Sequence, residues 1–206
     1  MQVFLIHGMG RTSASMALLA RRLRQAGHGT SSFGYLVSRQ SIDDIVSRWV
    51  EHIERHRSAE PERGFAVVGH SLGNVITRRA SPRLPALSHF VMLAPPNHPP
   101  ALARALERNP IFRALTRDAG QKLLDDDGFY SSLPVPVAKT LIIAGDGGPR
   151  FARSPWKGAP NDGVVSVDET RLPGLEPVVV DAIHTLIMNQ RAVAGLTLRF
   201  LSEGVV

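Results

Sequence analysis

A serine held between two nearby glycines is the feature that most constrains the fold of this chain. The segment GHSLG, residues 69–73, follows an apolar run at 65–68 and precedes a stretch of helical spacing. A serine on so tight a strand-to-helix turn has strained backbone angles, and its neighbours two residues away come too close to other backbone for side chains. The pattern therefore predicts a serine hydroxyl held above a sheet, at the electropositive start of a helix.

Short apolar runs alternate with amphipathic segments along the rest of the chain. The clearest amphipathic segment begins at Ser41, with Asp44 three residues later in a spacing close to a capping box. Strands that alternate with helices indicate right-handed βαβ units and a parallel sheet. We expect a doubly wound α/β fold, with a mostly parallel sheet of about six strands flanked by helices. The expected strands are residues 3–6, 30–35, 65–68, 89–93, 141–144 and 178–180, and a last helix is expected from about 185 to 201.

One segment interrupts this alternation. Residues 95–136 open and close with prolines and include two stretches of helical spacing, 101–107 and 111–124. The segment is too long for an ordinary crossover and too short for a separate domain. We expect one domain over residues 1–206, with residues 95–136 forming a short helical cap or lid above the sheet.

Composition excludes several classes of protein. The chain has no cysteine, which excludes disulfides, cysteine-bound zinc and a cysteine nucleophile. Its net charge of +6 comes from scattered arginines without interleaved aromatic residues, so we expect a solvated surface and no nucleic-acid partner. His52 and His56 are one helical turn apart without a third ligand, and we expect surface histidines and no metal.

The sequence also predicts where the chain resides. The longest apolar runs fall far short of the ~18 residues that a membrane-spanning helix needs. The first residues lack the basic start of a signal peptide and read as a core strand. With no cysteines and no such segments, we expect a cytoplasmic protein without a transmembrane segment.

A serine acts as a nucleophile only beside a base, and the base needs an orienting acid. His184 follows the apolar run 178–180, in a loop where α/β folds place their sites. Two acids compete for the third role. Asp162 lies in a turn before an extended apolar stretch, and Asp146 directly follows the run 141–144. A helix-capping role for His184 and a simple turn role for Asp162 are the structural alternatives.

Acyl transfer also needs N–H donors for the oxyanion. The backbone N–H of Leu72, next to Ser71, is one candidate. The other is the N–H of Met9, in a glycine-rich loop directly after the first strand, where His7 and Gly8 would shape the turn.

Together these residues resemble the α/β-hydrolase superfamily, and most closely its small lipase and esterase branch. The resemblance covers nearly the whole chain and implies a Ser71–His184–Asp162 triad, a cap after the strand that follows the serine, and no cofactor. Asn74 departs from the family pattern, which often has a second glycine there, and residues 94–99 lack the glycine and serine of many lipases. The residues that support the resemblance around the triad are His7, Gly8, Gly69, His70 and Gly73.

The resemblance implies a serine hydrolase that cleaves a small-molecule carboxylic ester through an acyl-enzyme. Acyl transfer to another acceptor, thioester cleavage and a non-catalytic member that binds an apolar ligand are the alternatives. The residues leave the acyl chain length, interfacial activation and the oligomeric state open.

Overall fold

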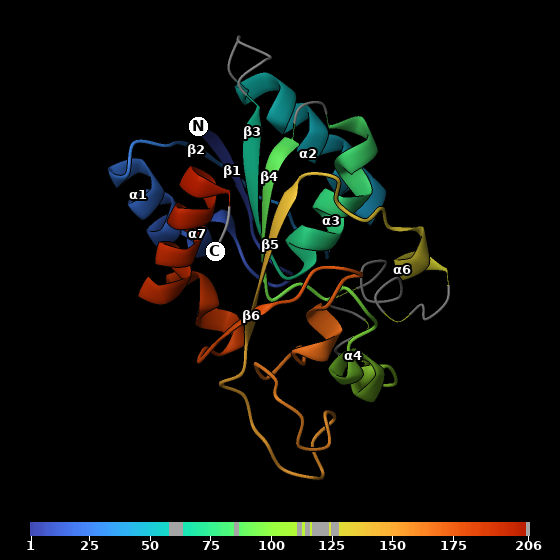
Figure 1. The fold of residues 1–206 in the computed structure, drawn as a ribbon. Coiled ribbons are helices and arrows are strands. Elements are labelled where there is room, and N and C mark those ends of the chain that lie inside the picture. The colour runs from blue at the N-terminus through green and yellow to red at the C-terminus, as the bar shows by residue number, and fades with distance from the viewer. Residues whose placement is uncertain are drawn as a thin grey trace.

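A single parallel sheet forms the centre of the molecule (Figure 1). The structure is a computed structural model that describes residues 1–57, 64–84, 87–110 and 128–204, together with residues 113, 116 and 124. Across these residues the sheet has six strands in the order β2-β1-β3-β4-β5-β6, and every neighbouring pair is parallel. This confirms the predicted fold class. The strands are β1 (Gln2–Ile6), β2 (Gly29–Phe33), β3 (Phe65–His70), β4 (Leu87–Leu93), β5 (Lys139–Gly145) and β6 (Val178–Val180).

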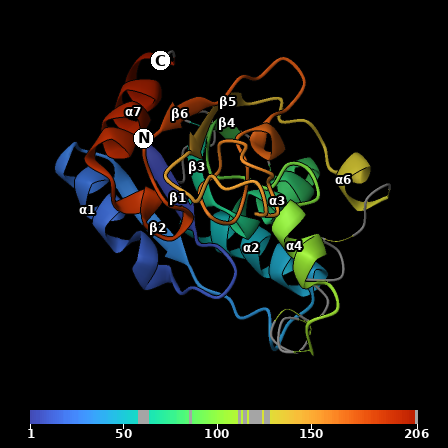
Figure 2. The same ribbon diagram turned by 90° about the horizontal axis from the view of Figure 1, so that it is seen from below.

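Helices cover both faces of the sheet. α1 (Ala17–Gln25) and α7 (Arg191–Glu203) lie on one face, and α2 (Ile42–His56) and α3 (Leu72–Ala80) lie on the other (Figures 1 and 2). Alternate residues of the central strands supply one apolar cluster under each pair of helices. This two-sided burial explains why the strands appear in the sequence as continuous apolar runs.

The start and the apolar face of α2 match the sequence prediction. The Ser41 hydroxyl accepts a hydrogen bond from the Asp44 N–H, and the Asp44 carboxylate accepts one from the Ser41 N–H, which together form a capping box. The stripe facing the core is buried and consists of Ile42, Ile45, Val46, Trp49, Val50 and Ile53.

The strand order identifies where a site can form. Because all strands are parallel, their carboxyl ends share one edge of the sheet, which is the lower edge in Figure 1. The chain leaves β1 for β2 on one side and returns as β3 on the other side, so the topology switches direction between β1 and β3. Open α/β sheets bind ligands at such a switch point. The loops after β1 and β3 are residues 7–10 and the turn at Ser71.

Some element boundaries differ from the expected ones. The expected strand 30–35 is β2, which ends at Phe33. The expected last helix is divided at Gln190, whose extended backbone (φ −65°, ψ 140°) separates a 3-10 helix from α7. The 3-10 segments are η1 (Ser13–Met16), η3 (Ser81–Arg83), η4 (Asp168–Thr170) and η5 (His184–Asn189).

The described part of residues 95–136 contains α4 (Ala101–Leu106) and α6 (Phe129–Ser132). The helix expected at 111–124 lies almost entirely outside the described residues. No helix in the described part of the chain has both the length and the apolar composition to cross a lipid bilayer.

Candidate active site

Ser71 occupies a strained turn between β3 and α3. Its backbone has φ 51° and ψ −122°, in the positive-φ region that residues other than glycine rarely adopt. A Cβ on Gly73 would lie 2.7 Å from the Ile6 carbonyl oxygen, and a Cβ on Gly69 would collide with Asn74 Oδ1. The glycines are therefore required by the close approach of their neighbours, as the spacing predicts.

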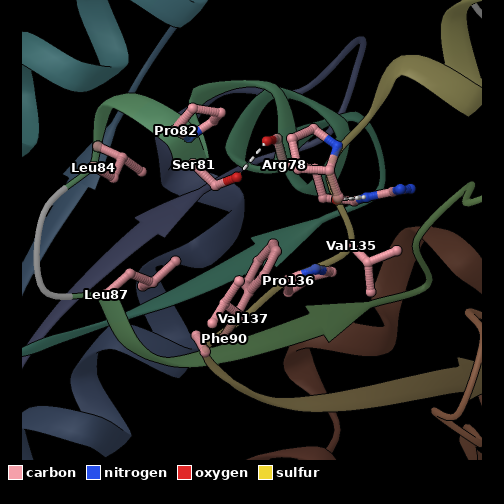
Figure 3. Close-up of a pocket in the computed structure, with 11 residues that line it drawn as sticks. Arg78, Ser81, Pro82, Leu84, Leu87, Phe90, Val135, Pro136 and Val137 are labelled. Atoms are coloured by element: carbon pink, nitrogen blue, oxygen red, sulfur yellow. Dashed lines mark hydrogen bonds between the residues drawn. The ribbon is translucent and has the colours of Figure 1, made fainter.

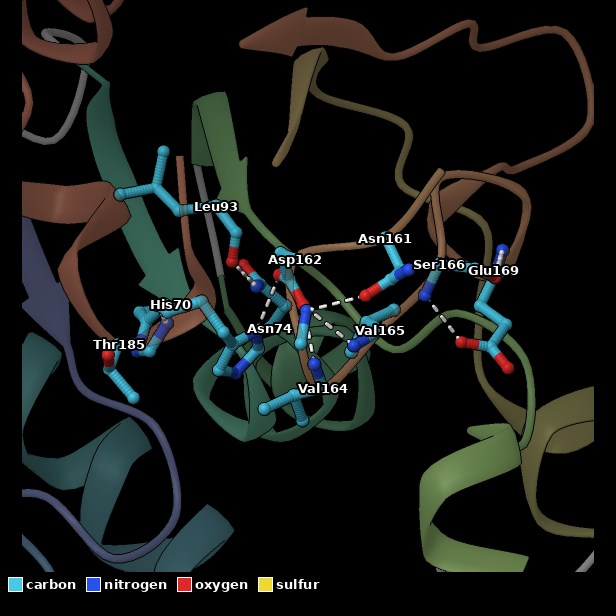
Figure 4. A network of polar contacts seen from close by, with 12 residues as sticks. His70, Asn74, Leu93, Asn161, Asp162, Val164, Val165, Ser166, Glu169 and Thr185 are labelled. Carbon is cyan, nitrogen blue, oxygen red and sulfur yellow. Dashed lines mark hydrogen bonds and ion pairs between the residues drawn. The ribbon is translucent and has the colours of Figure 1, made fainter. Parts of the chain in front are cut away.

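Hydrogen bonds to β4 fasten this turn. The Ser71 N–H donates to the Leu93 carbonyl at 2.9 Å, and Asn74 Nδ2 donates to the same oxygen at 3.1 Å. The Asn74 N–H also donates to the Ser71 carbonyl at 2.9 Å. Asn74, which departs from the family pattern, is fully buried and joins the serine turn to the neighbouring strand (Figure 4).

His184 and Asp162 form a buried pair. His184 Nδ1 lies 2.6 Å from Asp162 Oδ2, and the side chains are about 8% and 1% exposed. The carboxylate's other oxygen accepts from the N–H groups of Val164 at 2.9 Å and Val165 at 2.7 Å (Figure 4). Since a carboxylate only accepts, Nδ1 carries the hydrogen, and Nε2 is left able to accept a proton.

The position of His184 relative to Ser71 is set through His70. His70 Nε2 donates to the His184 carbonyl at 3.0 Å, and the two imidazole rings are 4.8 Å apart. The Ser71 side chain makes no capping hydrogen bond to α3, and among the described residues the His184 side chain bonds Asp162 and not Ser71. Catalytic hydrogen bonds often tighten only when substrate binds.

His70 itself is a buried, neutral group. Burial lowers its pKa well below 6.5, and the neighbouring His184 lowers it further. Because Nε2 donates to a carbonyl, Nδ1 is the unprotonated atom, and it has no hydrogen-bond partner among the described residues. A Cβ on Gly8 would lie 2.8 Å from this atom. His70 therefore lies between Gly8 in the loop after β1 and the backbone of His184.

The competing acid, Asp146, pairs with a different residue. Its carboxylate lies 2.5 Å from Arg150, and its side chain is 27% exposed. Asp162 reaches His184 because β5 ends in Gly145, where a Cβ would come within 2.9 Å of Asp162 Cβ. The structure therefore brings Asp162, and not Asp146, into contact with His184.

The loop after β1 lies directly against the serine turn. A Cβ on Gly8 would come 2.9 Å from Ser71 Cβ, so only glycine fits. His7 is held by its neighbours. Its Nδ1 donates to the Gly8 carbonyl at 2.7 Å, and its Nε2 accepts from the Tyr35 N–H at 3.2 Å. Burial lowers the His7 pKa, which favours this neutral ring.

The two predicted oxyanion donors are available. Across the described residues, neither the Met9 N–H nor the Leu72 N–H donates a hydrogen bond. Leu72 is the first residue of α3, whose first N–H groups have no partner inside the helix. Both amides therefore remain the predicted oxyanion donors.

Sequence reasoning missed two residues that organise the site. Tyr35 stacks on His7 with ring centroids 4.3 Å apart, and its hydroxyl donates to the His7 carbonyl at 2.8 Å. Glu169 accepts from the Ser166 N–H at 2.7 Å and from the Ala101 N–H at 2.6 Å. Burial raises the Glu169 pKa. Tyr35 could have been predicted from its position just after β2, the strand next to β1. No feature of the sequence pointed to Glu169.

Two cavities differ in their relation to this site. A cavity of about 530 Å³ borders His7, Met9 and Tyr35. Another of about 280 Å³ lies between the end of α3, the start of β4 and residues 134–138 (Figure 3). The start of a parallel strand is opposite its carboxyl end, so the second cavity lies away from Ser71.

Within the described ranges, no three or more His, Asp or Glu side chains come close enough together to hold a metal ion. The ring of His52 faces Ser31, with 2.9 Å between Nε2 and Oγ, and His56 Nδ1 donates to the His52 carbonyl at 2.8 Å. Both histidines therefore have protein partners.

The parallel sheet, with a serine on a glycine-flanked turn after β3, has the α/β-hydrolase fold. Residues 1–121 match the model of the Hydrolase_4 family, described as serine aminopeptidase, S33. The chain belongs to this family of the α/β-hydrolase superfamily. The matched residues include the loop after β1 and the serine turn, and they end before Asp162 and His184.

Solved structures share the fold at low sequence identity. The mature Bacillus licheniformis lipase BlEst2 is 18% identical with a TM-score of 0.73, covering 100% of this chain and 92% of the lipase. Legionella pneumophila phospholipase PlaB is 16% identical with a TM-score of 0.74, covering 98% of this chain and 59% of the phospholipase. A metagenomic carboxyl esterase is 14% identical with a TM-score of 0.73, covering 100% and 76%. A comparison with curated protein sequences gave no match.

Proposed function

We propose that this protein is a serine hydrolase that cleaves carboxylic esters through an acyl-enzyme. The observation that carries the proposal is the buried His184–Asp162 pair, fastened through His70 beside the strained Ser71 turn. A histidine with Nδ1 held by a carboxylate and Nε2 free is arranged to act as a general base. Three structures of similar fold are named as a lipase, a phospholipase and a carboxyl esterase, and all three names denote enzymes acting on esters.

The chemistry follows from the roles of these groups. His184 Nε2 takes the Ser71 proton as Oγ attacks the ester carbonyl carbon, and Asp162 stabilises the resulting imidazolium. The Met9 and Leu72 N–H groups bind the oxyanion, and each such donor lowers the barrier by roughly 3 kcal/mol. The imidazolium then protonates the departing alcohol.

Water completes the cycle. His184 removes a proton from water as the water oxygen attacks the acyl-enzyme, and the second tetrahedral intermediate is held by the same two N–H groups. Its collapse releases the carboxylic acid and returns the proton to Ser71 Oγ. The cycle uses only groups of this chain, the ester and water.

We further propose that residues 1–206 form one catalytic domain, with residues 95–136 as a cap. The hydrogen bonds of two side chains, Glu169 and Asn97, support this reading. Glu169 joins Ser166, next to the acid, to Ala101 at the start of α4. Asn97 Nδ2 donates to the Thr170 carbonyl at 2.7 Å, and Asn97 Oδ1 accepts from Arg78 at 3.0 Å. The start of the cap is thus fixed to the segment that carries the acid.

The direct test compares the hydrolysis of 4-nitrophenyl butyrate by the wild type and by Ser71→Ala. We expect kcat to fall on the order of 10⁴-fold or more, because the nucleophile is lost. Circular dichroism before and after heating checks that the variant folds. Unchanged turnover by a folded Ser71→Ala variant contradicts the proposal.

A further inference from the structure

The cavity beside the loop after β1 has the chemistry of a binding site for an apolar group. It measures about 530 Å³, within the range of small-molecule sites. One wall is the loop after β1 and the other is the segment 35–38 that follows β2. Thr116, from the proposed cap, also lines it. The side chains that define its chemistry are Met9, Arg11, Tyr35, Leu36 and Val37.

The position of the cavity assigns it to one part of an ester. When Ser71 attacks, the carbonyl oxygen must face the Met9 and Leu72 N–H groups, while the acyl chain and the alcohol leave the carbonyl carbon in different directions. The alcohol must stay within reach of His184, which protonates it. The cavity borders Met9, and no residue of the His184 loop lines it. It therefore lies on the acyl side.

Arg11 is the charged side chain among the described residues that line this cavity. Its Nη2 donates to the Thr185 carbonyl at 2.8 Å, so the guanidinium is held by the residue that follows His184. The Arg11 charge also helps to lower the pKa of His70. The cation is therefore close to the place where the scissile carbonyl must sit.

A positive charge at this place discriminates between acyl groups. The α-ammonium of an aminoacyl substrate is attached to the carbon next to the scissile carbonyl, so it would lie at the mouth of the cavity beside Arg11. Like charges brought close together repel, and an ammonium also loses hydration on entering an apolar cavity. An alkyl chain has neither penalty and gains from burial.

We propose that this cavity binds the acyl group of the substrate, and that Leu36, Val37 and Arg11 select uncharged acyl chains of medium length over acyl groups that carry a free α-ammonium. This inference rests on the proposed ester hydrolysis. It places the chain apart from the aminopeptidase activity in the description of its family.

The first test changes the size of the cavity in both directions. Val37 is a buried member of the core cluster, so Val37→Ala enlarges the cavity from the core side, and its folding is checked by circular dichroism. Leu36 is 47% exposed, so Leu36→Trp narrows the cavity from the solvent side. With 4-nitrophenyl esters from acetate to laurate, we expect Val37→Ala to move the best substrate to longer chains. Leu36→Trp should move it to shorter chains, with roughly tenfold changes in kcat/KM at the flanks of the profile.

Leu18→Trp is the matched control for Leu36→Trp. Leu18 is 40% exposed on α1 and does not line the cavity. Its variant should keep the wild-type profile. With acetate as with the longer esters, the kcat/KM of Leu18→Trp should stay within about twofold of the wild-type value.

The second test isolates the charge. Ethyl hexanoate and the ethyl ester of norleucine differ only in the α-amino group, which is largely protonated at pH 6.5. In a pH-stat assay we expect the wild type to prefer the hexanoate by on the order of 100-fold. Arg11→Glu should reduce this preference at least tenfold, whereas Arg11→Lys should preserve it.

The outcomes separate this inference from the proposed function. If Ser71 reacts with a fluorophosphonate and acetate is hydrolysed, but the chain-length profile moves in neither cavity variant, the acyl-site assignment is wrong. Equal rates on the two ethyl esters contradict the role of Arg11 in the same way. Absence of both ester turnover and Ser71 labelling overturns the proposed function itself.

Discussion

The turn at residues 69–73 and the turn at residues 161–166 position their polar groups in different ways. The Ser71 turn combines close packing with hydrogen bonds to β4: Gly69 and Gly73 occupy places where a Cβ would meet other atoms, Ser71 has a strained φ of 51°, and its N–H donates to the Leu93 carbonyl. Asp162 is fixed by hydrogen bonds from its own turn, and its carbonyl accepts the His184 N–H at 2.8 Å.

The difference shows which parts of such a site a sequence encodes locally. The glycine pattern of the serine turn falls within five positions, so it can be recognised in the sequence, even though the atoms it approaches belong to Ile6, His7 and Leu93. The acid depends on β5, β6 and the loop between them, so the sequence favours Asp162 but still leaves Asp146 as a rival until the chain is folded. The predictions below test this contrast.

The largest expected effect distinguishes the two aspartates. Asp162→Asn should lower kcat by roughly 10⁴-fold, because an amide in that place no longer holds the His184 tautomer that accepts the Ser71 proton. Asp146→Asn should change kcat less than twofold, because it breaks only the partly exposed pair with Arg150. Steady-state kinetics on one ester measures both. The reverse ranking would make Asp146 the acid.

The close packing at the serine turn is tested by the same glycine-to-alanine change in two helices, at Gly73 in α3 and at Gly195 in α7. Gly73→Ala places a Cβ 2.7 Å from the Ile6 carbonyl and 2.8 Å from the His7 carbonyl, backbone atoms that cannot move aside. We expect it to lower the free energy of unfolding by about 1–3 kcal/mol.

Gly195→Ala in α7 is the control, because a Cβ there meets nothing within 4 Å. It should raise the free energy of unfolding by up to about 1 kcal/mol. Urea denaturation measures both values. Equal effects at the two positions would show that close packing does not require glycine at residue 73.

A smaller effect is expected where the acid turn meets the proposed cap. Glu169→Gln keeps the shape of the side chain but supplies one acceptor oxygen in place of two, so the N–H of Ser166 or of Ala101 loses its partner. We expect a loss of about 1.5 kcal/mol in stability, measured by urea denaturation. The nearby Asp168→Asn, at a mostly exposed carboxylate, is the control and should have little effect. A Glu169→Gln variant as stable as the wild type would contradict this link.

The smallest expected effect is a pH dependence from His70. Its folded pKa is lowered well below 6.5 by burial, so below pH 6.5 the unfolded chain binds a proton that the folded chain excludes. The free energy of unfolding is therefore highest above pH 6.5 and falls as the pH drops below it, by up to about 1.4 kcal/mol per pH unit.

His70→Gln does not titrate and can still donate to the His184 carbonyl. It should lose less stability than the wild type between pH 7.5 and pH 5.5 in parallel urea titrations. The other histidines with lowered pKa titrate in both proteins, so the difference isolates His70. Parallel pH profiles would show that His70 does not titrate in this way.

Sequence reasoning reached the fold class, because buried apolar runs and glycine-flanked turns are local signals. The sequence did not predict that the last helix breaks at Gln190. No glycine or proline marks that break, because tertiary packing decides where it falls. Sequence reasoning placed Asp162 in the triad but kept Asp146 as a rival acid. That choice depends on the N–H groups of Val164 and Val165 and on the space left by Gly145.

The central claim is that Ser71 is an activated nucleophile, and covalent labelling tests it most directly. The wild-type protein is treated with a fluorophosphonate beside Ser71→Ala and Asp162→Asn, and the adduct is mapped by mass spectrometry. We expect a single adduct on Ser71, absent from Ser71→Ala and formed far more slowly in Asp162→Asn. A folded wild-type protein that stays unlabelled, or is labelled at another residue, contradicts the claim.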